Sequence, residues 1–269
     1  MMVDGWLRPL FRSIAFATYA FLLSPIVVVL IASTTAADFV SFPPQGFSLR
    51  WYAEIARRPD FLESAFISLV LAALTALGAT ILAVPAAIGL VRHRFPGREL
   101  LSALFLSPLM LPSVVIGIAL LQSASRLGVL GNPVVLWLAH VLIATPYCLR
   151  LLMASLTGFD RNLERAAMNL GASRLQAFLR VVLPLIAPGA AAGAAFAFVV
   201  SFDDLVVSMF LSSPTLVTLP VRIYNFIDQS SSPLITAIGS LLVLVAVAMV
   251  VLIDRTVGVE GAFRMGHKR

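Results

Sequence analysis

Long stretches without charged residues constrain this chain more than any other feature of its sequence. Five stretches contain no Asp, Glu, Lys, Arg or His and a sixth is interrupted only by His140; they cover residues 13–37, 64–91, 100–125, 127–149, 181–202 and 229–253. A helix of about 20 apolar residues crosses about 30 Å of hydrocarbon. The sequence therefore predicts an all-α integral membrane protein with six transmembrane helices in a single domain over residues 1–269. The predicted spans are 13–35, 65–91, 100–123, 133–153, 183–203 and 232–253.

Composition supports the membrane class and excludes several others. Charged residues make up 12% of the chain and hydrophobic residues 60%, whereas soluble domains carry about 25% charged residues. The net charge is +6, but the 19 Lys and Arg residues are dispersed through short loops, which predicts lipid and not nucleic acid as a partner. Cys148 is the single cysteine, and the three histidines are far apart in the sequence. No disulfide within the chain and no metal site are therefore expected.

The basic residues predict the orientation. With six spans, the segments on the side of the N-terminus hold 14 Lys and Arg residues against 6 acids, and the opposite segments hold 5 against 7. Cytoplasmic loops are enriched in Lys and Arg, so both termini and the loop 157–182 are predicted in the cytoplasm. The first apolar run is longer than the core of a secretory signal, which favours an uncleaved helix over a signal peptide. On the outer side, Leu49, Tyr52, Ala53 and Ala56 predict a short amphipathic helix.

The loop 157–182 has the pattern of two helices joined by a tight bend. Apolar residues recur at i, i+3, i+4 and i+7 in Leu163, Ala166, Ala167 and Leu170. Gly171 occupies the position that follows a helix C-terminus, and Ser173 with Gln176 has the spacing of a capping box. The sequence thus predicts a short surface helix with a small apolar face, a bend, and a second helix that leads into the span 183–203.

No catalytic motif accompanies these features. A phosphate-binding loop of the Gly-x4-Gly-Lys type needs its lysine, and the only lysine in the chain is Lys268, next to the last residue. The sequence also contains no Gly-x-Ser-x-Gly, His-Glu-x2-His or Cys-x2-Cys. We therefore expect a protein that is not an enzyme and has no catalytic residues.

Residues 165–184 resemble the loop signature of the membrane subunits of binding-protein-dependent ABC importers. That signature is Glu-Ala-Ala, three residues, Gly, nine residues, Ile, one residue and Leu-Pro. This chain has Arg165, Ala166 and Ala167, then Gly171, then Val181, then Leu183 and Pro184, with every spacing kept. It departs from the signature at Arg165, which replaces the usual glutamate, while Glu164 lies one position earlier.

Two outer stretches are similar to the second permease of spermidine/putrescine importers, namely FSLRWY at 47–52 and SFDDLVVS at 201–208. The two resemblances together imply a permease of the type I ABC importer fold in the bacterial inner membrane, moving a small polar solute, most simply a polyamine. They also imply four kinds of partner contact: a second permease subunit in a heterodimer, two ATP-binding subunits, a periplasmic solute-binding protein and membrane lipid. ATP and Mg would be bound by the partner ATPase, with no cofactor in this chain.

The resemblance implies that residues 160–171 form a coupling helix that docks on the ATPase. The coupling residues would be Glu164, Arg165, Ala166, Ala167, Leu170 and Gly171. The alternative is an amphipathic helix that lies on lipid, although interfacial helices usually carry Trp, Phe or Leu and flanking lysines, and this face is rich in alanine.

Asp203 and Asp204 lie about twenty residues beyond Pro184, which at 1.5 Å per residue places them about 30 Å away, near the outer surface. They are candidates for the substrate pathway, because acidic groups there would favour a cationic amine. A helix cap or a salt bridge to Arg222 would equally explain them. Gly189 and Gly193 leave a similar choice open, between close helix packing and the lining of a pathway.

Different functions stay open on the sequence alone. The solute could be an aminophosphonate or an opine-like compound in place of a polyamine. An autonomous ion-coupled carrier would need ionisable residues inside the membrane, and among the spans only His140 lies there. The third class is a membrane scaffold that does not transport, in which the cytoplasmic loop is only a docking site.

Overall fold

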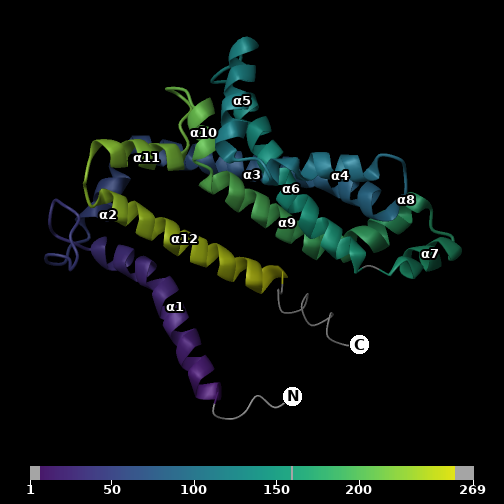
Figure 1. Ribbon diagram of the computed structural model, residues 1–269, viewed down its shortest axis with the longest axis horizontal. Helices are drawn as coiled ribbons and strands as arrows, with labels where there is room; N and C mark the ends of the chain where they lie inside the picture. Colours follow the sequence, from purple (N-terminus) through teal and green to yellow (C-terminus); the bar gives the residue numbers. More distant parts are fainter. Residues whose placement is uncertain (1–6, 159, 258–269) are drawn as a thin grey trace. The chain divides into compact units, whose positions relative to one another are not determined.

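The structure, a computed structural model, describes residues 7–158 and 160–257 of the 269-residue chain. The regular secondary structure of these residues is helical (Figure 1). An isolated β-bridge also pairs Ser213 with Leu216. The all-α prediction is confirmed for this part of the chain. The elements are α1 (Leu7–Ala32), α2 (Arg50–Ala56), α3 (Pro59–Arg92), α4 (Arg98–Leu106), η1 (Ser107–Leu109), α5 (Ser113–Arg126), α6 (Pro133–Thr157), α7 (Arg161–Asn169), α8 (Arg174–Ala177), η2 (Phe178–Val182), α9 (Leu183–Asp203), α10 (Val206–Leu211), α11 (Leu219–Gln229) and α12 (Leu234–Val257).

Four of the described helical stretches are long and apolar enough to cross a membrane, and a bent pair of helices would add a fifth span. The four are Pro9–Ala32, Pro59–Arg92, Pro133–Thr157 and Arg174–Asp203. They include the predicted spans 65–91, 133–153 and 183–203 in full and most of 13–35. Over the predicted span 232–253 the structure has α12, Leu234–Val257.

The predicted span 100–123 is not one straight helix. α4 and η1 run to Leu109, α5 begins at Ser113, and the two directions differ by 98°. Pro112 caps α5 with an extended ψ of 132°, and a proline both lacks an N–H for the helix ladder and disfavours helical conformation in the residue before it. The prolines at 108 and 112 therefore turn a charge-free stretch into a broken span or a re-entrant loop.

The chain divides into two compact units. In the described chain, one comprises residues 7–62 with 223–256, and the other comprises residues 63–222. The single domain over residues 1–269 stays a prediction.

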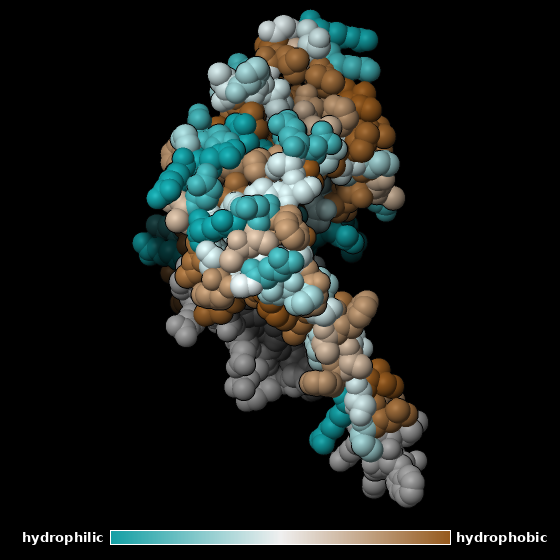
Figure 2. Space-filling view, turned by 90° about the vertical axis from the view of Figure 1, so that its left-hand side faces the viewer, coloured by the Kyte–Doolittle hydropathy of each residue, from teal (hydrophilic) through white to brown (hydrophobic). Residues whose placement is uncertain are grey.

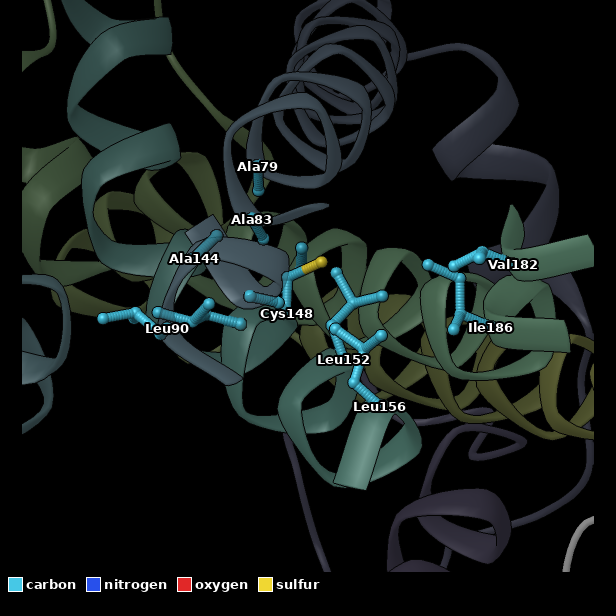
Figure 3. Packing of buried hydrophobic residues seen from close by; sticks show 12 residues of the cluster. Ala79, Ala83, Leu90, Ala144, Cys148, Leu152, Leu156, Val182 and Ile186 are labelled. Atoms are coloured by element: carbon cyan, nitrogen blue, oxygen red, sulfur yellow. The ribbon is translucent and has the colours of Figure 1, made fainter. Parts of the chain in front are cut away.

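The larger unit has its core where α3, α6 and α9 meet (Figure 3). Ala79, Ala83 and Ala87 recur every four residues on α3 and are fully buried. Leu149 and Leu152 of α6 are also fully buried. Small residues on α3 thus leave room for the larger side chains of α6, which is how a tightly packed interior is filled.

α6 and α9 approach each other closely at two glycines. A Cβ atom on Gly189 would lie 2.5 Å from Cβ of Ser155, and one on Gly193 would lie 2.8 Å from Sγ and 3.2 Å from Cα of Cys148. No side chain fits at these distances, so glycine is what allows the two backbones to pack. Of the two interpretations of this glycine pair, the structure shows close helix packing.

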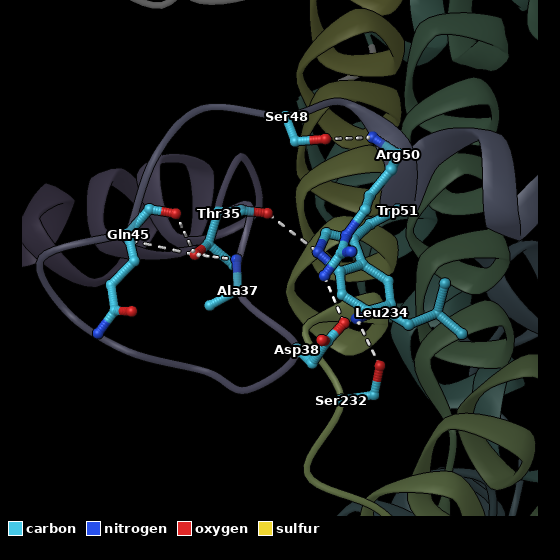
Figure 4. Close-up of polar contacts among 9 residues, drawn as sticks. All are labelled: Thr35, Ala37, Asp38, Gln45, Ser48, Arg50, Trp51, Ser232 and Leu234. Carbon is cyan, nitrogen blue, oxygen red and sulfur yellow. Dashed lines mark hydrogen bonds and ion pairs between the residues drawn. The ribbon is translucent and has the colours of Figure 1, made fainter.

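In the smaller unit, α2 is the short amphipathic helix that the sequence predicts, and its side chains fix it to neighbouring segments. Trp51 Nε1 donates to the carbonyl oxygen of Thr35 at 3.0 Å, and Arg50 forms an ion pair with Asp38 (Figure 4). The hydroxyl of Tyr52 lies 2.7 Å from the hydroxyls of both Ser33 and Ser240, which are buried. The FSLRWY stretch therefore holds α2 against the end of α1 and against α12.

Beside α2 the smaller unit has an open polar hollow of about 470 Å³. Its lining includes Arg50, Glu54, Arg57, Arg58 and Phe226. Hydrogen bonds to the carboxylate of Asp60 raise the pKa of the Arg58 guanidinium, while partial burial acts the other way. Hydrophilic side chains gather on the face that carries α2 and the loop 33–49, with hydrophobic surface beside them (Figure 2). The surface is therefore mixed, because the loop also exposes large apolar side chains, among them Phe39, Phe42 and Phe47.

Candidate functional site

The bend after α7 has the backbone geometry of a Schellman motif. Gly171 has a φ of +94°, a left-handed conformation that favours glycine. The N–H of Gly171 donates to the carbonyl of Met168 at 3.0 Å, and the N–H of Ala172 donates to the carbonyl of Ala167 at 3.1 Å. These two bonds satisfy carbonyls that the helix end leaves without partners. The predicted helix end at Gly171 is confirmed.

Both helices of the loop begin at side-chain caps. The carboxylate of Asp160 accepts from the N–H of Asn162 at 2.9 Å at the start of α7. At the start of α8, Ser173 Oγ accepts from the N–H of Gln176 at 3.2 Å, and Gln176 Oε1 accepts from the N–H of Ser173 at 2.9 Å. The predicted capping box is therefore present, and caps of this kind each contribute about 1 kcal/mol to a helix.

The second helix of the loop continues into the membrane span without a break. α8, η2 and α9 together form one stretch, Arg174–Asp203, in which η2 is a π-helical turn. The wide turn precedes Pro184, which has no N–H to donate to the carbonyl of Arg180 four residues earlier. The bend at Gly171 is thus connected to the far end of α9 through continuous helix.

An ion pair fixes the orientation of α7. Arg92, in the last turn of α3, donates through Nη1 to Oε2 of Glu164 at 2.7 Å. The side chains of Arg92 and Glu164 are 11% and 24% exposed, so water screens this pair less than a surface pair. Glu164, a predicted coupling residue, therefore faces the bundle and ties α7 to the end of α3.

Most of the remaining predicted coupling residues are exposed. Leu170 is 90% exposed, Leu163 is 48% exposed, and Ala166 and Arg165 are also exposed. Ala167 is half-buried. The structure thus brings Leu163, Ala166 and Leu170 together as an outward apolar stripe, which we call the α7 stripe, and turns Ala167 partly inward.

Asp204 caps a helix at the opposite end of α9. Its carboxylate accepts from the N–H of Ser208 at 2.8 Å and faces that of Val207 at 3.5 Å, at the beginning of α10. The Asp204 side chain is only 10% exposed. For Asp204, the structure therefore shows the helix cap that the sequence left open.

His140 is the centre of a buried polar cluster that the sequence pattern did not assign. It is fully buried on α6, with Nδ1 2.8 Å from Ser201 Oγ on α9 and Nε2 3.0 Å from Ser208 Oγ on α10. Its Nε2 also lies 3.8 Å from Oδ2 of Asp204. These four residues form a polar cluster, which we call the His140 cluster, that joins three helices. The signal in the sequence was the histidine itself, because a buried imidazole needs hydrogen-bond partners.

Arg222 does not form the salt bridge to the acidic pair that the sequence allowed. It donates through Nε to Ser64 Oγ at 3.2 Å, and among the described residues no ion pair joins it to either aspartate. Asp203, unlike Asp204, is exposed. Asp203 is thus the more accessible of the two aspartates at this end of α9, and the pathway role of both stays a prediction.

Comparison with known proteins agrees with these features. The family described as "Binding-protein-dependent transport system inner membrane component" matches residues 79–259. The chain is 32% identical to the spermidine/putrescine transport system permease protein PotC of Escherichia coli (strain K12), over 87% of this chain and 89% of PotC. It is 35% identical to the putrescine transport system permease protein PotI of the same strain, over 83% of this chain and 82% of PotI.

A solved structure shares the fold. A chain from the crystal structure of a bacterial alginate ABC transporter, in complex with an alginate pentasaccharide-bound periplasmic protein, superposes with a TM-score of 0.71 at 16% identity, covering 94% of this chain and 93% of that one. The resemblance drawn from residues 165–184 is confirmed. This chain belongs to the family of inner membrane components of binding-protein-dependent transport systems.

Proposed function

We propose that this chain is a transmembrane permease subunit of an ATP-driven ABC importer that moves a polyamine, such as putrescine or spermidine, across the bacterial inner membrane. The observation that carries the proposal is the α7 stripe, an exposed apolar surface held at the end of the bundle by the Arg92–Glu164 ion pair. An exposed leucine such as Leu170 on a capped and rigidly tied helix is suited to insertion into a groove of another protein.

The proposed topology has six spans and cytoplasmic termini. The spans would be α1, α3, the bent pair of α4 with α5, α6, the stretch from α8 to α9, and α12. Large apolar side chains are exposed along α1, including Phe16 and Phe21, which is expected where a helix faces lipid or a second permease subunit. The distribution of Lys and Arg supports the placement of α7 in the cytoplasm.

Energy would come from separate subunits. The sequence has no lysine in a phosphate-binding loop, so ATP and Mg would be bound by two partner ATPase subunits that dock on residues 160–171. A second permease would complete a heterodimer, and a periplasmic binding protein would deliver the solute, as the alginate transporter with its periplasmic protein suggests.

The polyamine assignment rests on the two permeases named above, whose similarity extends over most of the chain. A polyamine is cationic, and the exposed carboxylate of Asp203 would attract it electrostatically. Selection of the solute would lie largely with the binding protein.

Reconstitution in proteoliposomes tests the proposal. Uptake of labelled putrescine or spermidine is expected only with the second permease, the ATPase, the binding protein and ATP together. The variant Leu170→Asp should lower uptake and ATPase copurification at least tenfold, since a buried leucine contributes about 1.5–3 kcal/mol. Leu127→Asp is the matched control, because Leu127 is 75% exposed but lies after α5, on the outer side in this topology.

Three results would contradict the proposal. Uptake by this chain alone would indicate an ion-coupled carrier, and no uptake in any combination would indicate a scaffold. Uptake that survives Leu170→Asp would show that the α7 stripe is not the docking surface.

The ion pair makes a separate prediction about coupling. Glu164→Gln removes the charge partner of Arg92 and leaves Leu170 in place, so the ATPase should still bind. Transported solute per ATP hydrolysed should fall about fivefold or more, because a partly buried charged hydrogen bond contributes about 1–3 kcal/mol. Glu99→Gln is the control, since Glu99 is exposed on α4 and no ion pair is recorded for it in the described chain. The double swap Arg92→Glu with Glu164→Arg should restore part of the coupling, and unchanged coupling in Glu164→Gln would refute this role.

A further inference from the structure

The loop 157–182 uses its acidic and basic side chains differently. Its two acids are Asp160 and Glu164. Asp160 accepts from the backbone N–H of Asn162, and Glu164 is paired with Arg92. Both carboxylates are therefore engaged within the chain.

Two exposed basic side chains of the same loop have no recorded ion pair with an acidic side chain of the described chain. Arg165 on α7 and Arg174 on α8 are both exposed, and within residues 7–158 and 160–257 no ion pair is recorded for either. Arg165 directly precedes Ala166 of the α7 stripe in the chain, about 100° further around the helix, and α8 contacts α7. The outward surface of the loop thus combines an apolar stripe with uncompensated positive charge.

The position of Arg174 adds an independent observation. It is the first residue of α8, directly after the cap at Ser173. The helix dipole and the exposed N–H groups disfavour a cation in a first turn. A carboxylate from outside the chain would offset this unfavourable position, and no carboxylate within the described chain does so.

We infer that the groove which receives α7 has an apolar floor for Leu163 and Leu170 and a rim of Asp or Glu side chains that face Arg165 and Arg174. This inference rests on the proposed docking of the ATPase and adds the charge of its groove. Charged rim residues that match across an interface steer association and make it sensitive to salt. Arg165 and Arg174 would thus select an ATPase whose groove has an acidic rim over one whose groove has a basic rim.

Exposed arginines could also bind an anionic lipid surface, but the composition of the α7 stripe argues against this alternative. Helices that lie on membranes bury a wide apolar face with aromatic residues. α7 has nine residues, no aromatic side chain, and only Leu163 and Leu170 as large residues in its stripe. One flank of α7 is also occupied by the pairing of Glu164 with Arg92. A narrow protein groove fits this surface better than a lipid plane.

The test measures the affinity of the purified ATPase subunit for the assembled permease pair, in nanodiscs, between 50 and 500 mM NaCl, a range over which exposed charges become screened. The affinity of the ATPase for the wild-type permease pair should fall as salt rises. In the double variant Arg165→Glu with Arg174→Glu, this affinity at 50 mM NaCl should be about tenfold or more lower than in wild type. The double variant with Gln at both positions should have an affinity between those of wild type and the Glu variant. Arg94→Glu is the control, because Arg94 is exposed after α3 on the same side, and it should bind like wild type.

The outcomes separate this inference from the docking proposal. If the two Glu substitutions leave affinity and its salt dependence unchanged while Leu170→Asp still abolishes binding, docking stands and the acidic rim is wrong. If Leu170→Asp also binds normally, the docking proposal itself fails. Hydrogen exchange of residues 163–170, measured with and without ATPase, tests whether the loop binds lipid instead. Protection by phosphatidylglycerol nanodiscs without ATPase would overturn the inference, and protection only on adding ATPase would support it.

Discussion

Alanine at both Gly189 and Gly193 is expected to separate α6 from α9 and to lower the free energy of unfolding by about 2–6 kcal/mol. Each added Cβ would lie under 3.0 Å from a side-chain atom of α6, and overpacking a close-packed interior costs about 1–3 kcal/mol per site. At Gly193 the nearest atoms include the backbone of Cys148, which cannot rotate away. The single change at Gly193 should therefore cost more than that at Gly189, where Ser155 can adjust.

Cys148 provides the measurement. It is the single cysteine of the chain, fully buried in this contact, so its reaction with a thiol-specific dye reports the opening of α6 from α9. Every 1.4 kcal/mol of destabilisation should raise the labelling rate about tenfold. Gly89→Ala is the matched control, since a Cβ there meets nothing within 4 Å and alanine favours helix. Equal labelling rates in the double variant and in Gly89→Ala would contradict the packing argument.

Leucine at His140 is expected to lower the free energy of unfolding by about 2–4 kcal/mol. Ser201 and Ser208 would lose their side-chain partner, and each buried polar group left without a hydrogen bond costs about 1–3 kcal/mol. Because His140 joins α6 to α9 and α10, α10 should detach first. His93→Leu makes the same substitution at an exposed histidine and should change stability by less than about 0.5 kcal/mol.

A triple variant separates lost hydrogen bonds from a general effect of leucine. If Ser201→Ala and Ser208→Ala are added to His140→Leu, the unpaired hydroxyls disappear and part of the stability should return. Hydrogen exchange of residues 206–211 would locate the effect on α10. A triple variant that is less stable than His140→Leu alone would show that the serines do not act through the histidine.

Local signals in the sequence were sufficient for the cytoplasmic loop. Gly171, Ser173 and Gln176 act within a few residues of one another, through a positive φ and two side-chain caps, so their spacing predicts the geometry that the structure has. The same holds for the Gly189 and Gly193 pair, although the sequence alone could not distinguish packing from pathway lining. The partner atoms lie on α6, about 40 residues away.

Features that depend on distant pairs could not be predicted in this way. Arg92 and Glu164 are 72 positions apart, and His140 is 61 and 68 positions from its two serines. Only the fold brings them together. The break between η1 and α5 was missed for a different reason, because a count of uncharged residues at 100–123 ignores the backbone geometry that Pro112 imposes.

The two clamped glycines change what the stretch Arg174–Asp203 can do mechanically. Glycine and proline within a helix are often points of flexing, but here Gly189 and Gly193 are pressed against Ser155 and Cys148, and the helix continues through Pro188. At 1.5 Å per residue the 30-residue stretch is about 45 Å long. Clamped along its middle to α6, it is expected to bend little between Gly189 and Gly193. In the proposed topology, a displacement imposed at Ser173 would then be passed along this stretch toward Asp204, at the other membrane surface.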